Sequence, residues 1–212
     1  MAKAWATWLP DLLPQLPDCP NIIVEHEVKR AAQTFFEKTR AWAVTLDSES
    51  VAAGDYEIVL AASSGQEIVR VNQAWYDGVS LTPGSADYLA NQTSDAWQLH
   101  QGTPTAFVQE TPNVVRLYPI PVNNSTTGLV VRAAIKPSDS ASGIPDELAA
   151  KYRDAIASGA KGRLMLYANK PWSNPELGMK HEGDFNATMA HANLDAATSS
   201  GRSRVSSTPR WC

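Results

Sequence analysis

The sequence predicts an α+β protein, in which a helical bundle (one N-terminal and two C-terminal helices) is combined with an antiparallel β-sandwich or barrel-like region and an extended C-terminal tail. Three observations support this prediction. Apolar residues recur at helical spacing near both ends, short β-rich runs alternate with turn residues between residues 42 and 136, and the last fifteen residues are almost entirely polar. The chain therefore divides into a Pro-rich N-terminal arm (1–19), a single domain (20–197) and a tail (198–212).

Size and composition indicate a soluble protein with a substantial core. The 212 residues carry 18 basic and 22 acidic side chains, for a net charge of −4. A chain of this size buries about 70% of its surface on folding. Cys19 and Cys212 lie at opposite ends, which excludes a disulfide scaffold and indicates a protein made in a reducing cytoplasm. No run approaches 18 consecutive apolar residues, so we expect no membrane-spanning helix.

The charge is distributed unevenly along the chain. Residues 41–137 carry four basic and nine acidic groups, whereas the last fifteen residues carry Arg202, Arg204 and Arg210 and no acid. Because phosphate contacts need clustered Lys and Arg, this distribution excludes a globally basic nucleic-acid-binding protein. The simplest interpretation of the acidic body is ordinary solubility.

The N-terminal end predicts an irregular arm followed by a long helix. Residues 1–20 contain four prolines spaced three or four apart, which excludes a long helix there. Leu and Trp side chains lie between these prolines, so we expect the arm to pack against the body. Over residues 20–39, Val24, Val28 and Phe35 recur at helical spacing, which predicts a helix.

The middle of the chain predicts seven short strands. The pair Asp77-Gly78 is typical of a two-residue hairpin turn. Turn residues every 8–15 positions favour an antiparallel sandwich or barrel, and no βαβ unit is expected. The predicted strands lie at residues 42–46, 55–60, 67–76, 79–81, 105–109, 114–118 and 129–135, with a short helix and loop over 85–101.

The last third predicts two helices that form an antiparallel pair. Pro145 suits a first helical turn and two acids follow it, so a helix is expected over 145–168. Its centre, Ala155-Ile-Ala-Ser-Gly-Ala-Lys-Gly162, is rich in small residues, which lets another backbone approach closely. A Pro-containing break precedes a second helix over 174–197. We expect packing between helices or subunits to rest on Tyr152, Ile156, Gly159, Leu164, Trp172 and Phe185.

No residue pattern predicts a catalytic centre, a metal site or a cofactor. His181-Glu182 lacks the second His at i+4 that a zinc helix needs, and the neighbours in Glu25-His26-Glu27 diverge on a helix. Ser158-Gly-Ala-Lys-Gly162 superficially resembles a phosphate loop, but it lies inside a helical pattern and follows no strand. Asp55 and Glu57 share one strand face, which is typical of a solvated surface. We therefore expect no enzyme.

The tryptophans leave one alternative open. Trp42, Trp75, Trp97 and Trp172 lie at the ends of predicted elements, where packing in a core or an interface is the usual explanation. A carbohydrate-binding β-sandwich uses such residues as stacking platforms. A monomeric β-sandwich carbohydrate-binding module is therefore the alternative function.

Several runs of the sequence together resemble a known family. They are Leu117-Tyr-Pro-Ile-Pro121, Ile135-Lys-Pro137, Ile144-Pro-Asp-Glu-Leu148, Gly159-Ala-Lys-Gly-Arg-Leu-Met-Leu166 and Pro171-Trp-Ser-Asn-Pro175. With the helix near the start, this pattern resembles the head-to-tail adaptor (connector) proteins of short-tailed bacteriophages. The resemblance spans roughly residues 20–204, so the arm and the Trp211-Cys212 end lie outside it.

The resemblance implies a structural virion protein. Such adaptors form a homo-oligomeric ring, a dodecamer, below the portal protein, and they dock the tail nozzle protein beneath. Genomic DNA passes through the ring without sequence-specific binding, no membrane is involved, and the particle is assembled in the host cytoplasm. The C-terminal extension typically reaches the portal. We expect Arg202, Arg204, Arg210 and Trp211 to make this contact, because arginine and tryptophan anchor interfaces.

Overall fold

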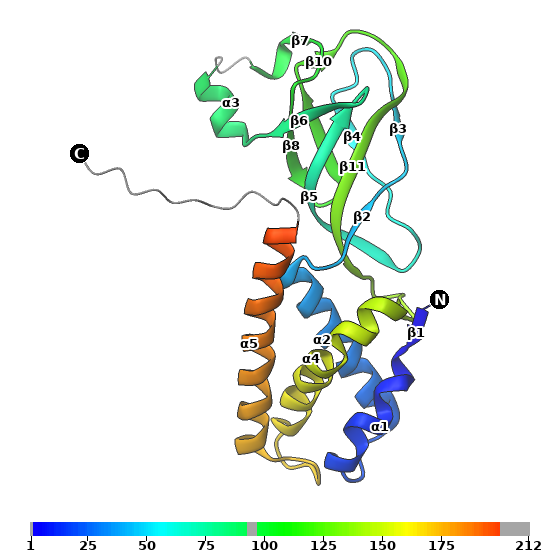
Figure 1. Cartoon of the computed structure of the whole chain (residues 1–212), viewed down its shortest axis with the longest axis vertical. Helices are drawn as coiled ribbons and strands as arrows, with labels where there is room; N and C mark the ends of the chain where they lie inside the picture. Colours follow the sequence, from blue (N-terminus) through cyan, green and yellow to red (C-terminus); the bar gives the residue numbers. More distant parts are fainter. Residues whose placement is uncertain (1, 93–96, 200–212) are drawn as a thin grey trace, which may run out of the picture.

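The computed structural model describes residues 2–92 and 97–199 and has two parts that follow each other along the long axis (Figure 1). A helical part contains both ends of the described chain. A β part holds a curved sheet of eight strands and one short helix. The predicted α+β class with a barrel-like β region is confirmed.

Three long helices account for most of the helical part. They pack pairwise against one another, and each buries one apolar face. In the first of them, Val24, Val28 and Phe35 are fully buried, as their helical spacing predicts. The three are α2 (Asn21–Thr39), α4 (Asp146–Met165) and α5 (Pro175–Ser199).

The N-terminal arm packs against the helices, as its apolar content predicts. Trp8, Leu12 and Leu16 are fully buried, and the indole Nε1 of Trp5 donates a hydrogen bond to the carbonyl oxygen of Ala141 at 2.8 Å. The prolines interrupt the helical geometry, so only short pieces form. These pieces are β1 (Ala2–Ala4), η1 (Trp5–Trp8), α1 (Leu9–Leu12) and η2 (Leu13–Gln15), and β1 pairs with β12 (Gly143–Pro145).

The main sheet contains all seven predicted strands and one that was not predicted. Its order is β2-β11-β5-β6-β8-β9-β4, and the unpredicted strand β3 also pairs with β11. The strands are β2 (Ala43–Thr45), β3 (Glu49–Val51), β4 (Glu57–Val59), β5 (Gln66–Tyr76), β6 (Val79–Pro83), β8 (Ala106–Thr111), β9 (Val114–Tyr118) and β11 (Ser125–Pro137).

The hairpin between β5 and β6 forms where the sequence predicts it. Asp77 and Gly78 both have positive φ, of 47° and 81°, which is the geometry of a two-residue turn that matches the strand twist. The turn brings Tyr76 opposite Val79 in antiparallel register.

The prediction of a purely antiparallel β region is wrong at two places. Strands β6 and β8 are parallel neighbours, and a second, two-stranded pair of β7 (Gln101–Gly102) and β10 (Ile120–Pro121) is parallel as well. The reason is the long connection after β6, which includes α3 (Ala86–Gln92) and returns the chain to the starting end of β6 before β8 begins.

The two parts are joined by a packed contact between α2 and β11. The end of α2 is fixed by Arg40, which adopts a left-handed conformation (φ 54°) and donates its backbone N–H to the oxygen of Phe36. The rings of Phe36 and Trp42 then meet edge to face at 5.5 Å. This junction, which we call the waist, orients the β part on the end of the helices.

Candidate interaction surfaces

Helices α4 and α5 approach each other closely along a line of small residues. A Cβ placed on Gly159 would lie 2.9 Å from the ring of Phe185, and one on Gly162 would lie 3.1 Å from the backbone nitrogen of Glu182. Positions 159 and 162 thus face positions 185 and 182, which makes the pair antiparallel. Glycine is required at 159 because the Phe185 ring occupies the space of a side chain.

The six residues predicted to support packing all take part in packing within the subunit. Apart from Gly159, their side chains are at most 7% exposed. Tyr152 stacks against Phe35 of α2 with ring centroids 4.7 Å apart, so it joins α4 to α2. Their part in contacts between copies stays a prediction. The buried side chains are Tyr152, Ile156, Leu164, Trp172 and Phe185.

A buried carboxylate lies between α2 and the end of α4. Glu27 is 1% exposed. Its Oε1 accepts a hydrogen bond from the Tyr167 hydroxyl at 2.8 Å and forms an ion pair with Arg30 at 3.1 Å. Arg163 lies 4.0 Å from its Oε2. Burial is the main cause that lowers the pKa of Arg163, and the hydrogen bond to Glu27 is the main cause that raises the pKa of Tyr167. The group holds α2 against the end of α4, and Oε2 of Glu27 is buried without a hydrogen-bond partner among the described residues.

We expect Glu27→Ala to lower the free energy of unfolding by about 2–3 kcal/mol, because Arg163 loses a buried partner while Arg30 stays solvated. Tyr167→Phe removes only one hydrogen bond, so about 1 kcal/mol is expected. Urea denaturation followed by circular dichroism measures both. Glu25→Ala, on the same helix and half-buried, is the control. Equal effects of Glu27→Ala and Glu25→Ala would contradict this role.

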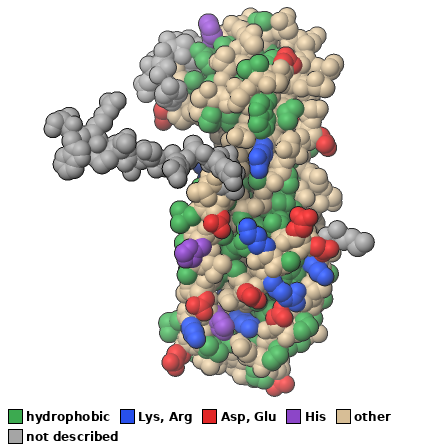
Figure 2. Space-filling model, in the orientation of Figure 1, with side chains coloured by type: hydrophobic (Ala, Val, Ile, Leu, Met, Phe, Trp, Pro, Cys, Tyr) green, Lys and Arg blue, Asp and Glu red, His purple; other side chains and the backbone are tan. Residues whose placement is uncertain are grey.

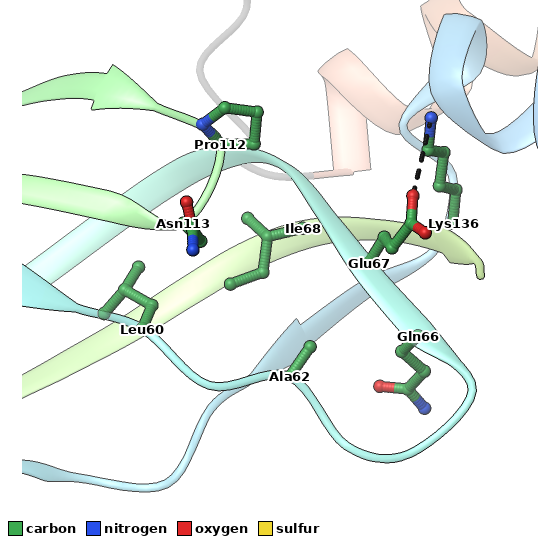
Figure 3. A pocket seen from close by; sticks show the side chains of 8 residues that line it. All are labelled: Leu60, Ala62, Gln66, Glu67, Ile68, Pro112, Asn113 and Lys136. Carbon is green, nitrogen blue, oxygen red and sulfur yellow. Dashed lines mark ion pairs between the residues drawn. The ribbon is translucent and has the colours of Figure 1, made fainter. Parts of the chain in front are cut away.

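A hollow on the β part has no arrangement that suggests catalysis. It measures about 420 Å³ and opens between the end of β4, the start of β5 and the β8–β9 turn (Figure 3). Its charged residues are Glu67 and Lys136, and the Lys136 amine pairs with Glu67 at 3.8 Å and with Glu37 at 2.9 Å. The other lining side chains are Leu60, Ala62, Gln66, Ile68, Pro112 and Asn113.

Two arginines that the sequence analysis did not single out meet at the waist. Arg40 at the end of α2 and Arg70 on β5 line two adjoining hollows of about 290 and 340 Å³. Thirty positions separate them in the sequence, and only the docking of the helical part on the sheet brings them together. No spacing rule predicts such a pair, although the scarcity of basic residues in 41–137 marks Arg70 as unusual.

On the visible face of the molecule, charged side chains are distributed unevenly between the two parts (Figure 2). Acidic and basic side chains gather on the helical part, whereas few charged groups lie on the visible face of the β part. Within residues 2–92 and 97–199, no group of three or more His, Cys, Asp and Glu is arranged to hold a metal ion. Among the helices of the same residues, none has the length and apolarity needed to cross a membrane.

The predicted tail contacts fall beyond the part of the chain that the structure describes. Arg202, Arg204, Arg210 and Trp211 belong to residues 200–212, and their contact with a portal stays a prediction.

Comparison with known proteins identifies the family. The model of the family described as SU10 adaptor protein matches residues 1–208. No curated protein matches the chain. The match confirms the resemblance to phage head-to-tail adaptors. It also extends the matching region from about residues 20–204 to residues 1–208. Residues 1–19 belong to the matched region, and their packing on α2 and α4 gives the physical reason, because the arm is part of the core. The chain therefore belongs to the SU10 adaptor protein family of bacteriophage structural proteins, which is not a family of enzymes.

Proposed function

We propose that this phage adaptor forms a homo-oligomeric ring that joins the portal to the tail nozzle and surrounds part of the DNA ejection channel. The observation that carries the proposal is the family match over residues 1–208, which includes every described element. An elongated subunit with a helical and a β part suits such a ring, because each part meets a different neighbour along the long axis.

The charge of the β part supports a role beside passing DNA. Residues 41–137 carry nine acidic and four basic groups. A negatively biased channel wall repels phosphates and lets the genome slide, whereas a basic wall would hold it. In this proposal some of these carboxylates line the channel.

The tail is proposed to fasten the ring to the portal. Helix α5 ends at Ser199, next to the waist, and the following residues include Arg202, Arg204, Arg210 and Trp211. The thirteen residues after Ser199 span about 45 Å when fully extended, which is enough to reach a neighbouring protein. Ordering it costs about 1–2 kcal/mol per residue, and contacts with a partner supply the compensation.

The alternative carbohydrate-binding role finds little support in the tryptophans. Trp5, Trp8, Trp42 and Trp172 are all less than 8% exposed, so their rings are not available for stacking on a sugar. Trp75 is half-buried on β5, and the side chain of Trp97 lies outside the part of the chain that the structure describes.

Mass measurement and electron microscopy of the purified chain, alone and mixed with the portal protein of the same phage, test the proposal. We expect a closed ring with more than one copy on each portal, with the helical and β parts stacked along the ring axis. A chain that stays monomeric in both preparations and does not bind the portal would contradict it. Reconstruction of the ring also locates the carboxylates of 41–137; if they lie only on the outer wall, the channel role falls.

A further inference from the structure

The waist presents an exposed pair of cations in a recess. Arg40 and Arg70 line both of the adjoining hollows, together with Val71 and Pro83. The end of α5 contributes to one hollow and the start of β8 to the other. The recess therefore combines the ends of two helices with three strands, and the waist junction fixes its shape.

Neither guanidinium forms an ion pair or a hydrogen bond with another described residue, and both side chains are exposed. Other described arginines do have a carboxylate partner. Arg116 binds Glu110 at 3.0 Å, and Arg153 binds Asp11 at 2.6 Å. A guanidinium is planar and carries five donors in a fork that fits a carboxylate. The recess is therefore built to receive an anionic group from outside the chain.

A different part of the β sheet carries the matching charge. Asp47, Glu49 and Asp55 lie on β3 or on the loops beside it, and none of their carboxylates forms an ion pair with another described residue. In the sheet, β2 and β3 pair with one edge of β11, and β5, which carries Arg70, pairs with the other edge. In Figure 1, β2 and β3 are drawn on the right of the β part and β6, β8 and α3 on the left. The recess and the three carboxylates thus belong to different strands.

We propose that the recess at Arg40 and Arg70 binds the Asp47–Asp55 segment of a second copy of this chain. This inference rests on the proposed ring. A head-to-tail ring needs two different, complementary patches on each subunit, and these two patches are different and opposite in charge. The same contact repeats around the ring, so each copy uses both patches.

A second copy fits the recess better than DNA does. Residues 41–137, which include Arg70, carry nine acidic and four basic groups, and this surplus over the β part as a whole repels a phosphate backbone. Exposed ion pairs are weak one at a time, but the contact contains several and repeats with every copy. Because the Debye length falls to about 3 Å at 1 M salt, the contact is expected to weaken as salt is raised.

The experiment uses two full-length variants with opposite charge changes. Arg40→Glu with Arg70→Glu makes both patches acidic, and Asp47→Lys with Asp55→Lys makes both patches basic. Each variant alone places like charges at every contact, so we expect the concentration needed for assembly to rise more than about 100-fold. An equal mixture restores opposite charges at every contact, and we expect rings of alternating variants. Mass photometry and native mass spectrometry, with and without the portal, measure both results.

The control and the other outcomes separate the explanations. Lys170→Glu with Lys180→Glu makes the same change in charge on exposed residues of the helical part and is expected to assemble like the wild type. If wild type forms rings and both charge variants do so equally well, the inference falls while the proposed function stands. If the wild type never assembles, both fall. Failure of the mixture to assemble also overturns the inference, as does a DNA-retention defect in an arginine variant that still forms rings.

Discussion

Replacing Gly159 with Leu is expected to lower the free energy of unfolding by about 2–3 kcal/mol. The Phe185 ring lies 2.9 Å from the position of the new Cβ, and Phe185 is itself 4% exposed and next to Phe35. Because a whole Leu side chain must fit against this ring, we expect overpacking to cost about 3–4 kcal/mol, at or above the upper end of the usual range. The gain of about 1 kcal/mol from replacing a helical glycine offsets part of this cost.

The matched control is Gly183, a glycine within α5 whose Cβ position has no atom within 4 Å. Gly183→Leu keeps the gain in helix propensity and avoids the clash, so it should stabilise the protein by up to about 1 kcal/mol. Thermal melts should show a midpoint lower by about 5–10 °C for Gly159→Leu and unchanged or higher for Gly183→Leu. If both variants melt together, the α4–α5 contact is not as close as described.

The second large effect is expected from removal of the tail. A chain that stops after Ser199 keeps all of α5, so its stability should equal that of the full chain. Its affinity for the portal should fall more than about 100-fold, because an interface loses Arg and Trp anchors that each contribute about 2 kcal/mol or more. Co-sedimentation with portal rings measures the loss.

A full-length variant separates the charge of the tail from its shape. The triple variant keeps the charge of the tail but removes the planar guanidinium groups; its substitutions are Arg202→Lys, Arg204→Lys and Arg210→Lys. Its retention on the portal should lie between that of the full-length chain and that of the truncated chain. Equal retention of the truncated and the full chain would remove the tail from the proposed contact. A truncated chain that also melts earlier would instead assign the tail to the fold.

The long helices and most of the strands were predictable because local patterns define them. The spacing of Val24, Val28 and Phe35 is periodic over several turns, and α2 begins one residue after the predicted start. The Asp77-Gly78 turn fixes the register of β5 and β6 in the same local way. In both cases the residues that decide the structure are close together in the sequence.

The elements that were missed depend on distant partners. Strand β1 exists because residues 2–4 pair with 143–145, and nothing within so short a strand indicates its partner. The parallel pairing of β6 with β8 depends on the path of the connection that contains α3. Strand β3 follows a bulged register along β11, which removes the regular alternation that marks a strand.

The candidate contacts were only partly visible in the sequence. Gly159 and Phe185 were singled out because small residues and aromatic residues in neighbouring helices suggest close packing, and the structure places them face to face. Glu27 was considered only as a metal ligand, since its burial depends on Arg163 of α4 and Tyr167 just after it, more than 130 positions away. No sequence pattern indicates that Arg40 and Arg70 come together until the waist forms.

The pairing of the first residues with a segment far along the chain has a consequence during translation. The indoles of Trp5 and Trp8 are synthesised about 140 residues before their hydrogen-bond partners Ala141 and Arg153. At about 5–20 residues per second, these indoles wait about 7–30 s for these partners, although α2 is available to them sooner. A chaperone that shields nascent apolar segments is therefore expected to raise the yield of correctly folded subunits more than it would for a chain whose tryptophans pair only with residues close to them in the sequence.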